Sequence, residues 1–159
     1  MTDGRTTSEA LHEFVDVLRE KNHEQQQALL DLLGVLKRER EALAEGQPEL
    51  LPGLLTELQE VSSRAMRAEA QRDAAATKLA GVLGCRPVLR EICEALPEGE
   101  AARLNDQAEG LIAAVSALRE VNYILSRQAD QQRFLAEMIL ERLKHLSPGS
   151  GTGVLDTMA

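Results

Sequence analysis

Apolar residues recur along the chain at alternating steps of three and four residues, and this spacing continues over most of its length. Side chains spaced in this way lie on one face of an α-helix, which predicts helices packed in a heptad register. The first stripe consists of Leu11, Val15, Leu18, Asn22, Gln25, Leu29, Leu32, Leu36, Glu39 and Leu43. Thr6 and Glu9 fit a capping box at the start of this helix. Gly46, within EGQPE, predicts its end.

A second helix is expected from about Pro48 to Leu83. Its stripe consists of Leu51, Leu54, Leu58, Val61, Ala65, Ala68, Arg72, Ala75, Leu79 and Val82. Proline suits a first helical turn because its missing N–H would have no intrahelical partner there. GCRP, residues 84–87, predicts the end of the helix. A short helix, VLREICEAL over residues 88–96, is expected next, and PEGE ends it.

The third long helix is expected from about Glu98 to Leu146, and its stripe is the most regular of the three. The stripe consists of Leu104, Ala108, Leu111, Val115, Leu118, Asn122, Leu125, Ala129, Gln132, Ala136, Ile139, Leu143 and Leu146. At a rise of 1.5 Å per residue, such a helix would span roughly 70 Å.

The connectors between these long helices are short, which predicts antiparallel neighbours. We therefore expect an all-α fold: an elongated up-down-up bundle of three long helices with coiled-coil packing, and one short helix between the second and the third. Residues 8–146 are expected to form this single helical domain. Residues 1–7 and the Gly- and Ser-rich residues 147–159 are expected to be flexible.

The composition agrees with long packed helices. Of the 159 residues, 43% are hydrophobic but only 2% are aromatic, with no Trp and one Tyr, so the core must come from Leu, Ala and Val. The alternation typical of strands is missing. The net charge is −8, and the one short basic cluster, KRER at residues 37–40, contains a glutamate. Nucleic acid is therefore not an expected partner.

Neither secretion nor stable membrane insertion is expected. The first residues, MTDGRTTSEA, contain no apolar region of a secretory signal, and no stretch approaches the ~20 apolar residues that a membrane span needs. Cys85 and Cys93 fit no zinc or redox spacing. We interpret them as small apolar side chains in a reducing compartment, and we expect a cytoplasmic protein.

Candidate chemistry is sparse. Glu9–His12 and Glu20–His23 match the Glu-x-x-His ligand pair of helical di-iron proteins. That site needs its pairs on different helices, whereas both pairs lie on one helix, roughly 16 Å apart along its axis. Such histidines are expected to be solvated. The chain also contains no glycine-rich phosphate loop and no nucleophile elbow. We expect no catalytic residue, no metal and no cofactor, and therefore no enzyme.

Of the polar residues that interrupt the apolar stripes, four are candidates for polar layers of the core. A simple hairpin around Gly46 places Asn22 opposite Arg72, which predicts one polar layer midway along the first two helices. Asn122 and Gln132 occupy stripe positions of the third helix. Polar residues at such positions fix the register at some cost in stability, or form partly hydrated layers of the core.

The end of the third helix is apolar around much of its circumference, because apolar residues also lie outside its stripe. A helix of this kind is either buried on all sides or covered by a partner. One interpretation is that the short helix at residues 88–96 covers it. The other is a partner-binding surface, in which methionine and glutamine side chains suit a permissive groove. Its candidate residues are Ile124, Gln128, Gln131, Phe134, Leu135, Met138, Ile139 and Leu143.

Three stretches, taken in order, resemble the FlgN-type chaperones of flagellar type III export. LLDLLGVLKREREALAEGQPELLPGLLTELQE is similar to the first helical hairpin of that family. AEAQRDAAATKLAGVLGCRPVLREICEALPE is similar to its second helix and short following helix. LREVNYILSRQADQQRFLAEMIL is similar to its last helix, with Leu118, Asn122 and Leu125 on an L-x-x-x-N-x-x-L pattern. The resemblance covers roughly residues 11–146.

The resemblance implies a cytosolic chaperone that binds the terminal helices of hook–filament junction proteins. Such a chaperone prevents premature assembly of these hook-associated proteins and delivers them to components of the export gate. The resemblance also places the substrate site in the C-terminal helical region. The alternative is a structural coiled-coil adaptor that acts by oligomerisation through the same surface.

Overall fold

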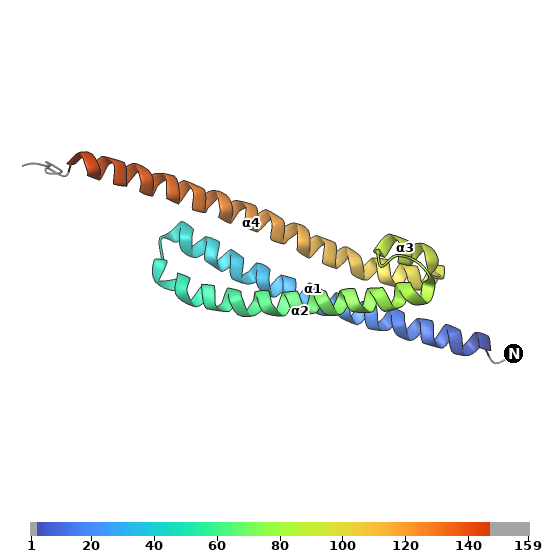
Figure 1. Ribbon diagram of the computed structural model, residues 1–159. Helices are drawn as coiled ribbons and strands as arrows, with labels where there is room; N and C mark the ends of the chain where they lie inside the picture. The colour runs from blue at the N-terminus through green and yellow to red at the C-terminus, as the bar shows by residue number, and fades with distance from the viewer. Residues whose placement is uncertain (1–2, 147–159) are drawn as a thin grey trace, which may run out of the picture. The chain divides into compact units, whose positions relative to one another are not determined.

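The computed structural model describes residues 3–146, with the side chains of most residues between 8 and 141. Three long helices, α1 (Asp3–Glu45), α2 (Leu51–Leu83) and α4 (Glu98–Leu146), are joined by a short 3₁₀ helix, η1 (Pro48–Leu50), and by the short helix α3 (Leu89–Ala95) (Figure 1). The described residues form no strand. The predicted all-α fold is therefore confirmed.

The start of α1 differs from its prediction. The helix begins at Asp3, so Thr6 lies inside it and the capping box with Glu9 was wrong. An aspartate in the first turn of a helix interacts favourably with the positive end of the helix dipole, which is consistent with the earlier start. Residues 3–7, which were expected to be flexible, therefore lie within α1. The predicted tail, 147–159, lies outside the described residues.

Two glycines end α1 and α2 as the sequence predicted. Gly46 and Gly84 adopt left-handed backbone conformations, with φ of 67° and 71°. The amide N–H of the residue after each glycine donates to the carbonyl oxygen five residues earlier, from Gln47 to Ala42 over 2.9 Å and from Cys85 to Ala80 over 3.0 Å. This is the Schellman arrangement, which satisfies carbonyl groups that the helix leaves unpaired.

The register of α1 against α2 is marked by two ion pairs. Arg64 lies 3.0 Å from Asp31, and Arg38 donates to Glu57 over 3.0 Å. The second pair lies seven residues later on α1 and seven residues earlier on α2 than the first. The two helices therefore run antiparallel with heptad spacing between equivalent positions.

Three apolar clusters stabilise the part of the described chain that precedes Tyr123. The first joins all four α-helices, with Leu18, Leu79, Ile92 and Leu104 at its centre. The second lies between α1 and α2 near Gly46. Between these clusters the helices meet through Ala28, Ala65 and Ala68, which we call the alanine waist. Alanine side chains bury little apolar area, so the waist contributes little buried apolar area to the interface between α1 and α2.

A ring of four polar side chains, His12, Asp16, Glu100 and Arg103, fixes the start of α4 to α1. His12 Nδ1 lies 2.7 Å from Glu100 Oε1 and His12 Nε2 lies 3.3 Å from Asp16 Oδ2. Arg103 closes the ring, 3.0 Å from Asp16 and 3.2 Å from Glu100. His12 is exposed, as expected, with 52% of its side-chain surface accessible, although it also takes part in this ring. The order of these contacts shows that the start of α4 runs in the direction of α1.

The buried face of α4 agrees with the predicted stripe at Leu104, Ala108 and Leu111, and then departs from it. Val121 is buried, whereas Asn122 is exposed. A helix that crosses its neighbours turns its contact face gradually, so one fixed heptad frame fails along its length. Contacts divide the chain after Asn122, and the part of α4 from Tyr123 onward forms a unit of its own.

Candidate functional site

The unit that begins at Tyr123 exposes a stripe of large apolar side chains. Tyr123, Phe134 and Met138 are 63%, 62% and 40% exposed. Because an α-helix turns by about 100° per residue, these three side chains project within about 60° of one another. Eleven residues, about three turns, separate Tyr123 from Phe134, and Met138 follows one turn later. We call these three residues the α4 stripe.

The predicted partner-binding residues fall into three groups. Gln131, Phe134, Met138 and Ile139 are exposed, whereas Ile124 and Gln128 are partly buried. The amide oxygen of Gln128 has no hydrogen-bond partner among the described residues. The side chains of Leu135 and Leu143 lie outside the described residues.

Tyr123 was missing from the predicted set, although it is the most exposed member of the α4 stripe. The signal that could have identified it is the spacing of eleven residues from Phe134. Eleven residues make about three helical turns but are not a multiple of seven, so a heptad frame gives the two residues different positions. The guanidinium of Arg127 lies over the Tyr123 ring, 6.0 Å from its centroid. Such a contact orients the ring while leaving most of its surface available.

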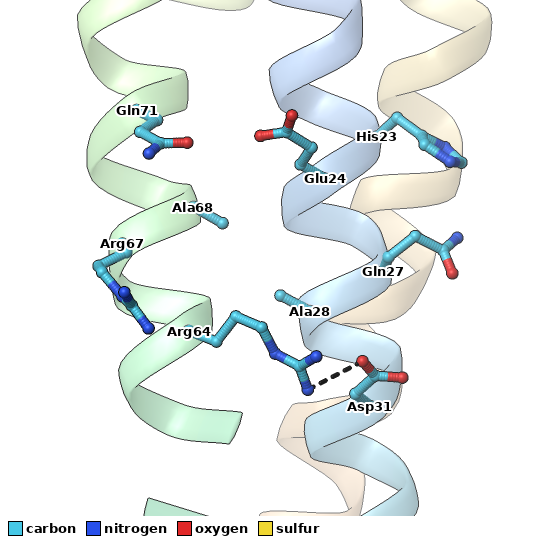
Figure 2. Close-up of a pocket in the computed structure, with 9 residues that line it drawn as sticks. All are labelled: His23, Glu24, Gln27, Ala28, Asp31, Arg64, Arg67, Ala68 and Gln71. Atoms are coloured by element: carbon cyan, nitrogen blue, oxygen red, sulfur yellow. Dashed lines mark ion pairs between the residues drawn. The ribbon is translucent and has the colours of Figure 1, made fainter. Parts of the chain in front are cut away.

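The α1–α2 hairpin carries a second candidate site at the alanine waist. A hollow of about 500 Å³ opens there between the two helices. Figure 2 shows Ala28 and Ala68 facing the gap, with Arg64 reaching across to Asp31. The hollow exists because alanine side chains are too short to fill the space between the helices. No group of His, Cys, Asp or Glu side chains that could hold a metal ion occurs among the described residues.

The predicted polar layer is only partly present. Asn22 is buried and Arg72 is partly buried, but among the described side chains no hydrogen bond joins them, and Arg72 pairs with Asp73 on its own helix instead. Asn122 is exposed and so belongs to no buried layer. The side chain of Gln132 lies outside the described residues. A further buried polar residue, Gln25, lies one turn from Asn22.

Neither cysteine shows the features of a nucleophile. Burial raises the pKa of the Cys93 thiol, which disfavours the reactive thiolate. The sulfur atom lies 3.4 Å from the amide oxygen of Asn105, to which the thiol donates. Both cysteines are free and partly buried, and both pack against the first apolar cluster. They act as small core side chains, in agreement with the interpretation from the sequence.

In the part of the chain that the structure describes, no helix combines the length and the apolar character that crossing a membrane requires.

Comparison with known proteins identifies the family of the chain. The family model described as FlgN protein matches residues 9–151, which is nearly the whole chain. Searches of curated proteins and of solved structures each found no match. The family match covers the hairpin, the short helix and the whole described length of α4, in agreement with the resemblance found in the sequence. The chain therefore belongs to the FlgN family of flagellar export chaperones.

Proposed function

We propose that the chain is a cytoplasmic chaperone for hook–filament junction proteins. It binds their amphipathic terminal helices, keeps them from assembling too early and delivers them to components of the export gate. It acts by binding alone, with no catalysed reaction and no cofactor. The observation that carries the proposal is the α4 stripe, because large apolar side chains gathered on one exposed helix face mark a binding surface.

The proposed mode of binding is the packing of one amphipathic helix against another. A subunit awaiting export keeps its terminal helices unassembled, so their apolar faces remain exposed to water. Phe134 and Met138 cover such a face and remove its apolar area from solvent, which is the main source of affinity. Gln131, also exposed, offers a neutral donor and acceptor beside them.

The test is a titration of the full chain with the terminal helical segment of a hook–filament junction protein from the same cells. Phe134→Glu and Met138→Glu should each weaken binding at least tenfold, because each places a charge in the apolar contact. Ala136→Glu is the matched control. Ala136 is exposed on the same helix, but projects about 140–160° away from each member of the α4 stripe.

Three results can be told apart. Weak binding by the stripe variants, with normal binding by Ala136→Glu, supports the proposal. Normal binding by all variants places the client surface elsewhere. If the chain forms a defined oligomer in light scattering, the client does not bind, and Phe134→Glu dissociates the oligomer, the protein is the structural adaptor that the sequence left as its alternative.

A further inference from the structure

The α4 stripe has two edges that differ in charge. Asp130 and Glu137 lie along one edge, about 20° and 40° from the direction of Tyr123 on the side away from Met138. Gln128 and Gln131 lie along the opposite edge. One edge therefore carries carboxylates and the other carries neutral amides. Asp130 and Glu137 are both exposed.

The two carboxylates have no partner among the described residues. Neither Asp130 nor Glu137 makes an ion pair or a hydrogen bond with another described side chain. Arg133 is one turn from each of them in sequence, but it projects farther round the helix, about 110° from the centre of the α4 stripe. The charge that borders the stripe on this edge is therefore negative and available to a partner.

The spacing of the carboxylates is that of a helix-to-helix contact. Seven residues separate Asp130 from Glu137, which places them about 10 Å apart along the axis and almost in line. A second helix lying along the stripe would present its own edge residues at the same interval. Acidic side chains at this spacing complement Lys or Arg residues two turns apart on the partner.

We infer that the α4 stripe selects client helices that carry basic residues along one edge. Asp130 and Glu137 are the residues that contact these basic side chains. The inference rests on the proposed function and adds to it the chemistry of the client. Charges at the border of an apolar contact act mainly on the rate of association and on the choice of partner. The net charge of −8 acts in the same direction at longer range.

The test compares two double variants that change the net charge equally. Asp130→Lys with Glu137→Lys reverses the carboxylate edge. Asp106→Lys with Glu109→Lys reverses two exposed acids of α4 that precede Tyr123 by fourteen residues or more. Association of each full chain with the terminal helical segment of the junction protein is followed by stopped flow at about 0.02 M and 1 M salt, and far-UV circular dichroism checks that each variant is folded.

The edge variant should associate about tenfold more slowly than the control variant at low salt, and the difference should disappear at high salt. A client whose Lys or Arg residues at that edge are replaced by Glu should recover the rate with the edge variant. If the unchanged chain binds the client and the two double variants associate equally fast, the inference is overturned while the proposed function stands. If the unchanged chain does not bind, the proposed function fails first.

Discussion

Gln25 of α1 and Arg72 of α2 each bury one polar atom without a hydrogen-bond partner, and the two atoms are complementary. The Gln25 amide oxygen is an acceptor and Arg72 Nε is a donor, and both lack partners among the described residues. Gln25 precedes Ala28 by one turn and Arg72 follows Ala68 by one turn, so they lie at the same level of the hairpin. The buried polar layer therefore includes Gln25, which the sequence pattern placed in the first stripe without predicting this role.

Replacing Gln25 by Met should stabilise the fold. The substitution keeps the length of the side chain and removes a buried acceptor without a partner, which costs about 1–3 kcal/mol in other proteins. We expect the free energy of unfolding to rise by about 1 kcal/mol in urea denaturation. Gln27→Met, at an exposed position of the same helix, should change it little. A loss of stability in Gln25→Met would mean that the amide is satisfied in solution.

The two glycines near the end of α2 should respond to alanine in opposite directions. Gly84 has a φ of 71°, where a Cβ atom is strained, so Gly84→Ala should destabilise the fold by about 1 kcal/mol. Gly81 is helical and exposed, and a Cβ there would meet nothing within 4 Å. Gly81→Ala should therefore stabilise the fold by about 0.5–1 kcal/mol. Thermal unfolding of both variants tests the pair, and equal shifts would contradict it.

Leu79 lies at the centre of the first apolar cluster. It is 0% exposed and contacts residues of the helices around it. Leu79→Ala should cost about 2–5 kcal/mol, because a cavity adds to the lost transfer energy. Leu55→Ala, on the same helix but half exposed, should cost much less. Similar midpoints for the two variants in urea would show that Leu79 is not a core residue in solution.

The ion pair between Arg38 and Glu57 predicts a dependence of stability on pH. The hydrogen bond from Arg38 lowers the pKa of Glu57 below its ordinary value of 4.5. The folded chain thus binds fewer protons here than the unfolded chain. The stabilisation is present above about pH 4.5 and is lost as the pH falls through the lowered pKa.

Arg38→Gln should therefore be less stable than the unchanged chain at pH 7 by a small amount that salt reduces. The difference should shrink as the pH falls below about 4.5. Urea denaturation at a series of pH values measures it. Lys37→Gln removes an exposed neighbouring cation and serves as the control. A difference that stays constant from pH 7 to pH 3 would assign the effect of Arg38 to packing.

The hairpin could be predicted well from the sequence because its signals are local. Glycines 46 and 84 allow left-handed conformations that few other residues adopt, and the structure uses both. Most predicted stripe positions of α2 are buried, including Leu54, Val61 and Leu79. Val82 is an exception, since it is exposed next to the end of the helix.

The face of α4 could not be predicted as well, because it depends on how helices cross and not on the local sequence. A heptad frame assigns Asn122 to the core, whereas the structure buries Val121. The same frame treats Tyr123 and Phe134 as unrelated outer positions, although three helical turns bring them into line. The ring around His12 joins residues more than eighty positions apart, and no spacing rule connects such groups.

The exposure of Tyr123 has a spectroscopic consequence. The chain contains one tyrosine and no tryptophan, so its tyrosine fluorescence comes from the α4 stripe. Arg127 lies against that ring, and a molecule that covers the stripe changes the contacts that quench the emission of the same fluorophore. The protein thus carries an intrinsic optical reporter at the position where we expect clients to bind, and no label has to be attached to the helix.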